Sequence, residues 1–394
     1  MSLSGVRVLD FSRVLAGPYC SLMLAELGAD VIKVEEPGAG DESRGWPPFI
    51  KGQSGYFFSV NRSKRSIGMN LKNESAKRII RELVAKSDVV LENFAPGVTK
   101  RLGIDYDTLA AINPRIIYCS VSGFGQTGPL RDKRAYDPIL QAMSGIMSVT
   151  GSRGGEPVKC GVPVTDVASA MVAAFSIAVS LYRREKTGKG QYIDLAMLDT
   201  GLAMMTFLSG MVLCAGEVPT TFGSENPTRV PSANYKCGDG RYVHVVINDR
   251  QWPKMCELLG LSEYASHPDF AVNKDRVANR DKVNAMISER MKTKTSEEWI
   301  TLFDAEGLPI GPVNTLDRIL ADPQVAAREM VKVFNHPIAG EVKCVDMPYR
   351  FAEDGTRILS APPLLGQHTD EILIDLLGYS KEDAERLKAE GAVS

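Results

Sequence analysis

One aspartate has a sequence context that suits covalent chemistry. Asp166 closes the turn VPVTD at 162–166 and precedes a stretch without charge that runs as far as Arg183. A carboxylate at the N-terminus of a mostly buried helix is stabilised by the helix dipole and by unpaired N–H groups, so it can stay ionised in a partly dry cleft. Such a carboxylate can act as a nucleophile. The alternative is an N-cap aspartate without a chemical role.

Basic residues recur where the chain is predicted to leave strands or to begin helices. They are Arg62, Lys64, Arg65, Lys72, Lys100, Arg101, Lys133 and Arg134. The chain as a whole is nearly neutral, with 46 Lys and Arg against 48 Asp and Glu. Clusters that meet at one rim of such a protein suit a small polyanionic ligand better than a nucleic acid. The alternative is ordinary solvated surface charge.

The segment 123–128 (GFGQTG) has the G-x-G-x-x-G spacing of dinucleotide-binding loops and follows a predicted strand. A phosphate-binding helix would have to begin directly after it, but Pro129 and the charged residues 131–134 stand there instead. No suitable acidic residue follows about 20 residues later. We therefore interpret the segment as a flexible glycine loop at the rim of a crevice.

Metal, disulfide and serine-triad chemistry are disfavoured. The four histidines lie in the C-terminal half without i,i+3 or i,i+4 pairing, and the seven cysteines include no C-x-x-C pair. This pattern predicts no metal site and fits a reducing compartment. Because the N-terminus has no signal-peptide pattern, we expect a cytoplasmic protein or one of an organelle matrix.

The first half of the chain must position these residues, and its pattern predicts an α/β fold. Strands are predicted at 6–11, 30–34, 88–91, 116–121 and 191–195, and helices at 19–27, 74–86, 106–112, 136–147, 166–184 and 197–214. Such alternation requires a parallel sheet with helices on both faces. Functional residues should then lie just after the strands, at the carboxyl ends. The uncharged stretches 167–182 and 200–216 fall short of a membrane span, and we predict buried helices and no membrane contact.

The length predicts two or three domains. We assign 1–215 to a large domain and 216–232, rich in Pro, Thr, Gly and Asn, to a linker. A smaller α+β domain follows at 233–325, with a strand at 242–247 and a capping box formed by Thr295 and Glu298. The segment 326–394 contains a last amphipathic helix at 369–377.

Several motifs together resemble one family. They are VLDF at 8–11, VLAGP at 14–18, LGADVIKVE at 27–35, NRSKRS at 61–66, ENFAPG at 92–97, SGFGQTGP at 122–129 and AYD at 135–137. In this order they are similar to signatures of the family III CoA-transferases, which include formyl-CoA transferase and carnitine CoA-transferase. The resemblance implies a Rossmann-like large domain to which 326–394 returns, and a homodimer of interlocked rings.

The resemblance also assigns roles to residues. Asp166 would be the nucleophile that forms an aspartyl anhydride and then an aspartyl-CoA thioester. The CoA contacts carry over to Leu15, Ala16, Met69, Asn70, Leu71, Lys72, Asn93, Phe94, Ala95, Arg101, Lys133, Arg134, Ala135 and Tyr136. Arg101, Lys133 and Arg134 would hold the phosphates. CoA or acyl-CoA would be a substrate, no cofactor would be tightly bound, and the partners would be acyl-CoA and a small carboxylic acid.

Two further motifs are similar to the branch that acts on succinyl-CoA and dicarboxylates such as glutarate, namely LPIGPVN at 308–314 and PPLLGQHT at 362–369. A dicarboxylate has a distal carboxylate that needs a cation in a desolvated cleft. Lys159 and Arg229 are the candidates for this substrate contact. Simple solvent exposure is the alternative for both.

The sequence also departs from relatives of known chemistry. Formyl-CoA transferase has Gln where this chain has Leu15 and Arg where it has Glu36, and its glycine-run loop has no counterpart in 223–229. A 2-methylacyl-CoA racemase would need a His where Tyr136 stands and a Glu where Asp249 stands. A CoA-transferase is therefore favoured over a racemase or a non-catalytic acyl-CoA binder. The oxyanion donors are left open between the glycine loops 123–128 and 151–155.

Overall fold

The computed structural model describes residues 1–352 and 360–394, and these residues form two compact units. The first unit comprises Met1–Ile146, Cys160–Ser209 and Gln324–Ser394, and the second comprises Met147–Lys159 and Gly210–Pro323. The sequence placed the corresponding boundaries at 215, 232 and 325. It gave no sign that 147–159 belongs with the second unit.

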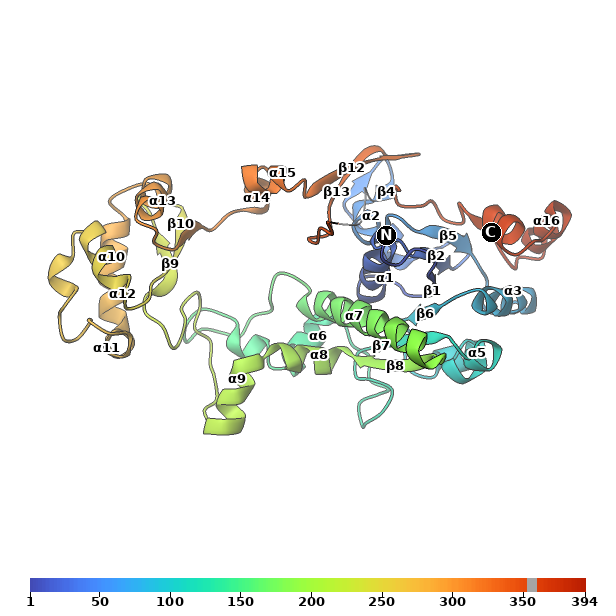
Figure 1. The fold of residues 1–394 in the computed structure, drawn as a ribbon, viewed down its shortest axis with the longest axis horizontal. Coiled ribbons are helices and arrows are strands. Elements are labelled where there is room, and N and C mark those ends of the chain that lie inside the picture. The colour runs from blue at the N-terminus through green and yellow to red at the C-terminus, as the bar shows by residue number, and fades with distance from the viewer. Residues whose placement is uncertain (353–359) are drawn as a thin grey trace. The chain divides into compact units, whose positions relative to one another are not determined.

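A six-stranded parallel sheet forms the centre of the first unit, as the α/β alternation predicts (Figure 1). Its order is β5-β2-β1-β6-β7-β8, with bounds Arg65–Gly68, Asp30–Glu35, Arg7–Asp10, Val89–Glu92, Ile117–Ser122 and Gln191–Ala196. The chain leaves β1 toward β2 and β5, and then returns to β6 on the other side of β1. The strand order therefore reverses between β1 and β6, where a ligand crevice is expected in an open α/β sheet.

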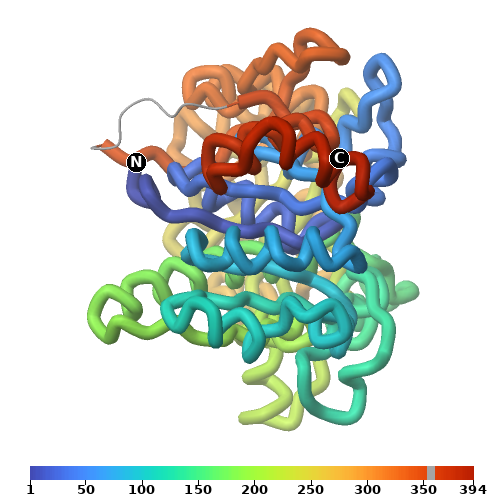
Figure 2. Tube along the Cα trace, turned by 90° about the vertical axis from the view of Figure 1, so that its right-hand side faces the viewer, coloured from blue at the N-terminus to red at the C-terminus, as the bar shows by residue number. Residues whose placement is uncertain are grey.

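Helices cover both faces of this sheet. Successive side chains of a strand point to opposite faces, and apolar side chains occur on both of them. Val8 of β1 packs with α1 (Ala16–Glu26) and α7 (Val164–Thr187), whereas the next residue, Leu9, packs on the opposite face. That face is covered by α3 (Glu74–Ala85), α5 (Tyr106–Ile112), η5 (Glu371–Leu376) and α16 (Lys381–Ala389). Figure 2 shows the red C-terminal segment beside the blue N-terminal strands, and the last residue, Ser394, donates its N–H to Gly68 at the end of β5.

Shorter elements complete the first unit. They are η1 (Glu42–Gly45), β3 (Phe49–Ile50), β4 (Gln53–Ser54), α2 (Gly55–Asn61), α4 (Val98–Leu102), α6 (Asp137–Met143), α8 (Met197–Met204), α15 (Pro323–Ala327) and the hairpin strands β12 (Val331–His336) and β13 (Gly340–Val345).

The second unit has its own core. An antiparallel sheet, β11-β10-β9 (Ile310–Pro312, Tyr242–Val246, Ser232–Lys236), packs with helices through the buried rings of Trp252, Trp299 and Phe303. The helices are α10 (Trp252–Leu258), α11 (Asn273–Ala278), α12 (Arg280–Met291), α13 (Ser296–Ala305) and α14 (Leu316–Leu320), with short turns η2 (Met147–Val149) and η4 (Ser262–Tyr264). The predicted capping box at Thr295 and Glu298 is present at the start of α13.

Two helix predictions are wrong in part. The single helix expected at 197–214 bends by 82° between α8 and the following α9 (Thr206–Gly210) and η3 (Met211–Ala215), and Thr206 at the bend has a left-handed φ of 37°. The helix α7 is not buried on all sides, since Phe175 is 70% exposed and Tyr182 is 68% exposed.

By length and hydropathy, α7 could also cross a membrane, and the bent pair could form a second span. That is weak evidence, because core helices pass the same test, and α7 packs on α1, α8 and the sheet.

Candidate active site

The loops after β1 and β6 meet at the point where the strand order reverses. The side-chain amide of Asn93, just after β6, holds the backbone of Arg13, just after β1, on both sides. Asn93 Oδ1 accepts the Arg13 N–H at 2.8 Å, and Asn93 Nδ2 donates to the Arg13 carbonyl at 2.8 Å. The two strand ends are therefore fixed relative to one another.

A buried ion pair supports the loop after β1. Lys33 Nζ lies 2.8 Å from Asp41 Oδ2 and donates to the Ser12 carbonyl at 2.8 Å, and neither charged side chain is exposed to solvent. Burial acts to raise the pKa of Asp41, but Lys33 and Ser43 hold it well below its usual value. Asp41 also accepts the N–H of Val14 at 3.2 and 3.3 Å. Val14 has a φ of 70°, which is strained for a β-branched residue and is held by these contacts.

Not all the basic clusters reach a ligand surface. Arg62 pairs with Glu26, and both side chains are buried. Lys64 Nζ is buried on the carbonyl of Pro18 at 2.9 Å, and burial lowers its pKa to about 7. Arg65 pairs with Asp30 on the neighbouring strand β2. For Arg62 and Lys64 the predicted ligand role is wrong, because both side chains are buried inside the fold. Arg65 is partly exposed, and its guanidinium is already paired with Asp30.

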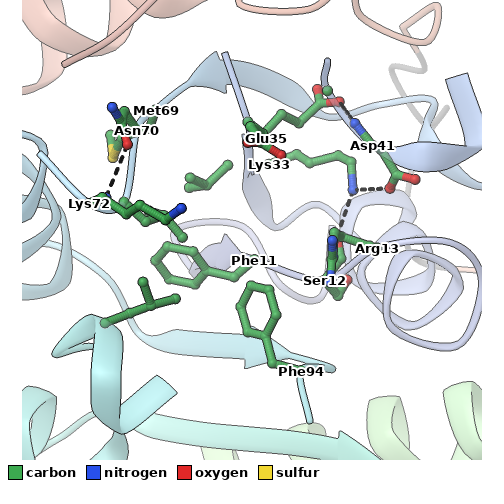
Figure 3. A pocket seen from close by; sticks show the side chains of 15 residues that line it. Phe11, Ser12, Arg13, Lys33, Glu35, Asp41, Met69, Asn70, Lys72 and Phe94 are labelled. Carbon is green, nitrogen blue, oxygen red and sulfur yellow. Dashed lines mark hydrogen bonds and ion pairs between the residues drawn. The ribbon is translucent and has the colours of Figure 1, made fainter. Parts of the chain in front are cut away.

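A first cavity opens beside the ends of β1 and β2 (Figure 3). The rings of Phe11 and Phe94 lie along one wall, and Lys33 reaches between Ser12 and Asp41 on another. The predicted CoA contacts Met69, Asn70, Leu71, Lys72 and Phe94 all line this cavity, and so does Glu36. The lining combines aromatic rings with charged side chains, a combination that suits a small-molecule ligand.

A second cavity contains Asp166. It is also lined by the predicted contacts Leu15, Ala16, Asn93, Phe94, Ala95, Lys133, Arg134, Ala135 and Tyr136. Arg13, Arg131 and Asp137 line it too, although the sequence assigned no ligand contact to them. The only predicted CoA contact outside both cavities is Arg101, at the end of α4.

Asp166 is the third residue of α7 and not its N-cap, so that alternative interpretation is wrong. The neighbouring Asp137 takes over the capping. Asp137 Oδ1 accepts the N–H of Thr165 at 2.9 Å, its hydroxyl at 2.6 Å and the N–H of Asp166 at 3.4 Å, while Oδ2 accepts from Gln141 at 2.6 Å. Among the described residues, none donates a hydrogen bond to the Asp166 carboxylate, which is left for a ligand.

The ionisation of Asp166 differs from the expectation. Burial, together with the negative charge of Asp137, raises the pKa of Asp166 to about 7. The carboxylate is therefore partly protonated at neutral pH in the unliganded protein, despite its place in the first turn of a helix. The charge of Asp166 also affects Tyr56 of α2. Burial, together with the negative charges of Asp166, Asp41 and Asp137, raises the pKa of Tyr56 to about 12.

The glycine loop after β7 also borders the Asp166 cavity, through Gly123. A Cβ at Gly123 would lie 2.7 Å from the Cβ of Ala135, so a larger residue would displace the 133–136 segment. The Gln126 N–H is bound by Asp194 at 3.0 Å, so the loop is anchored and not freely flexible. No helix begins until α6, which excludes the dinucleotide interpretation.

The remaining candidates lie in the second unit. Lys159, Arg229 and the glycine loop 151–155 belong to it, whereas Asp166 belongs to the first unit. The substrate role of Lys159 and Arg229 therefore stays a prediction. In residues 1–352 and 360–394, no group of three or more His, Cys, Asp or Glu side chains could hold a metal ion.

Comparison with known proteins agrees with the fold. The family model described as CoA-transferase family III matches residues 3–369. Succinyl-CoA:glutarate CoA-transferase of Mus musculus is 39% identical over 392 residues, covering 99% of this chain and 90% of the relative. Succinate–glutarate CoA-transferase of Agrobacterium fabrum is 37% identical over 381 residues, covering 95% of each chain.

A solved structure extends this likeness to three dimensions. The crystal structure of a CAIB/BAIF family protein from Brucella suis has a TM-score of 0.86 and 38% identity, covering 95% of this chain and 99% of the other. Sequence and fold therefore agree over nearly the whole length. The chain belongs to CoA-transferase family III and is an enzyme that transfers CoA.

Proposed function

We propose that this enzyme moves CoA from succinyl-CoA to a dicarboxylic acid such as glutarate, with Asp166 as the nucleophile. The observation that carries the mechanism is the position of Asp166 in one cavity with Lys133, Arg134 and the strand-end loops. The substrate pair is supported by the names of the relatives from Mus musculus and Agrobacterium fabrum. The motifs at 308–314 and 362–369 support the same branch.

The proposed reaction begins with attack of an Asp166 oxygen on the thioester carbon of the donor. The C–S bond breaks, and a mixed anhydride and the CoA thiolate form. The thiolate then attacks the Asp166 carbonyl carbon of the anhydride, the C–O bond to the donor acyl group breaks, and the donor leaves as a free carboxylate. The aspartyl-CoA thioester that remains reacts with the acceptor carboxylate by the same steps in reverse. No water, proton or oxidant is consumed, so transfer depends on keeping water from the two intermediates.

The two cavities suggest how the substrate lies. We place the nucleotide end in the first cavity, against Phe11 and Phe94 and near Lys72, and the thioester in the second cavity at Asp166. The glycine loop 123–128 borders the Asp166 cavity through Gly123, and we propose it as the source of oxyanion stabilisation. Lys159 and Arg229 remain our candidates for the distal carboxylate.

Trapping tests the nucleophile. Incubation of the wild type with succinyl-CoA and then hydroxylamine should leave a hydroxamate on the peptide that contains Asp166, as detected by mass spectrometry. Asp166→Ala should lose transfer activity while keeping its CoA dissociation constant within a few fold. A hydroxamate on Asp137 instead would reject Asp166 as the nucleophile and leave the transferase assignment intact.

An acceptor screen tests the substrate pair. With succinyl-CoA as donor, the wild type should prefer C4–C6 dicarboxylates over monocarboxylates of equal length. Lys159→Gln or Arg229→Gln should lower kcat/KM for the dicarboxylate more than for the monocarboxylate. A wild-type preference for monocarboxylates would overturn the dicarboxylate proposal.

A further inference from the structure

Arg13 lies between the motifs at 8–11 and 14–18, and neither these motifs nor the comparisons assign a role to it. Arg13 and Phe94 are the two residues that line both cavities, the one beside β2 and the one that contains Asp166. Any ligand that extends from one cavity into the other must therefore pass these two side chains. One of them is a cation and the other is an aromatic ring.

Hydrogen bonds hold both polar groups of the Arg13 backbone. Its N–H and its carbonyl are both held by the Asn93 amide at 2.8 Å. The next residue, Val14, is kept in a left-handed conformation by Asp41, which is itself anchored by the buried Lys33. Strain of this kind persists where the surrounding structure enforces it, commonly at ligand sites. The result is a guanidinium group carried on a rigid base.

The side chain of Arg13, by contrast, has only weak partners. Its Nη1 lies 3.1 Å from Glu42 Oε1, and the two side chains are 46% and 54% exposed. Exposed ion pairs contribute little stability. The guanidinium carbon stands 5.2 Å from the centre of the Phe94 ring, which holds the group at the junction. A polyanion that enters the junction can replace Glu42 with a stronger, charge-assisted contact.

We propose that Arg13 binds the diphosphate of the CoA substrate at the junction of the two cavities, with Glu42 as its displaceable partner in the empty enzyme. This proposal rests on the proposed use of CoA at Asp166. In a CoA thioester the diphosphate joins the nucleoside to the pantetheine arm, so a cation is needed where the nucleotide cavity meets the acyl cavity. Arg13 is held there by contacts independent of the ligand, and its planar fork suits phosphate oxygens.

Steady-state kinetics with two carriers tests this role. Arg13→Gln should raise KM for succinyl-CoA by about 10-fold and leave kcat nearly unchanged, as expected for the loss of one charge-assisted contact. The same variant should not change KM for succinyl-pantetheine, which lacks the phosphates. Arg13→Lys should restore part of the affinity, and Glu42→Gln should lower KM for succinyl-CoA because it removes a competing anion.

Arg115→Gln is the matched control. Arg115 also forms an exposed ion pair in the first unit, with Glu185 at 3.4 Å, but lines neither cavity. The Arg115→Gln variant should leave the KM values for succinyl-CoA and for succinyl-pantetheine unchanged. An equal rise in KM for both carriers in Arg13→Gln would show a structural role, and no rise for either would show a surface ion pair. Both results overturn the proposal.

Calorimetric binding separates this proposal from the proposed function. Titration of CoA and of pantetheine into wild type and Arg13→Gln needs no turnover, so it can be read even if Asp166 is not the nucleophile. The CoA dissociation constant should rise about 10-fold, and the rise should shrink with added salt. An unchanged CoA dissociation constant rejects the role of Arg13 whatever the reaction proves to be.

Discussion

Asp137 and Asp166 share one cavity but have different surroundings. Asp137 accepts hydrogen bonds from Thr165, Asp166 and Gln141, whereas no described residue donates to Asp166. Asp137 therefore holds the start of α7 in place and at the same time disfavours ionisation of its neighbour. A nucleophilic carboxylate with a raised pKa is a stronger base when it does ionise, which suits attack on a thioester.

This pair predicts how activity depends on pH. Because Asp166 must be ionised to attack and its pKa is raised to about 7, kcat/KM should rise with pH and level off above neutrality. Asp137→Asn keeps an oxygen for Thr165 but removes the like charge, so it should move the midpoint to lower pH. The measurement is kcat/KM for succinyl-CoA across the pH range in both proteins. A midpoint that stays in place in Asp137→Asn would contradict the coupling.

The same pKa shift predicts an effect on stability. The folded state disfavours ionised Asp166, so its contribution to stability is present below the usual pKa of 3.8 and is lost as pH rises to about 7. Asp166→Asn should therefore raise Tm by a few degrees at pH 8 and change it little near pH 4. Thermal unfolding at both pH values measures this. Asp107→Asn, at an exposed carboxylate in the first turn of α5, is the control and should not show the pattern.

At the scale of elements, the loop from β1 to α1 depends on the buried pair Lys33 and Asp41. Removal of one partner leaves a buried charge unpaired, which costs about 3–5 kcal/mol, whereas replacement of both by apolar residues costs less. Asp41→Leu should therefore destabilise the protein more than the double variant Lys33→Met with Asp41→Leu. Urea unfolding gives the free energies, and additive losses in the double variant would contradict a paired role. Both proteins should bind CoA more weakly, because Val14 loses the carboxylate that holds it.

The elements show what the sequence could predict and what it could not. Strand and helix periodicity located the parallel sheet, and the family resemblance supplied Leu15 and Asn93, which do line the Asp166 cavity. Arg13, Asp137 and Tyr56 were missed because their placement depends on partners far apart in the chain. The ligand role predicted for Arg62 and Lys64 was wrong for the same reason. Inside the fold, Arg62 pairs with Glu26 and Lys64 donates a hydrogen bond to the Pro18 carbonyl.

Other elements escaped prediction for local reasons. The strands of the hairpin, β12 and β13, are partly exposed and mix apolar with polar and charged residues, so their hydrophobic pattern is weak. The bend at Thr206 interrupts the uncharged stretch 200–216, and periodicity carries no sign of it. Pairing of the C-terminal residue with β5 joins residues far apart in the chain, so no local pattern could indicate it.

At the scale of the whole molecule, one face of α7 is both apolar and exposed. Ala170, Ala173 and Ile177 are buried against the sheet, whereas Phe175 and Tyr182 project on the other side. Met171, Val172 and Val179 extend this exposed surface, each more than two fifths exposed. A contiguous exposed apolar surface marks an interaction site. The homodimer expected from the family resemblance makes a second copy of this chain the occupant that we propose.

Phe175→Glu should therefore weaken self-association, because a dimer would have to bury a charge without a partner. Size-exclusion chromatography with light scattering should give about twice the chain mass of 42.9 kDa for the wild type and a shift toward a single chain for the variant. Ala85→Glu places the same charge at an exposed position at the end of α3 and should remain dimeric. If the wild type runs as a single chain, the exposed face of α7 has another function and the dimer proposal fails. If both variants stay dimeric, the interface lies elsewhere on the molecule.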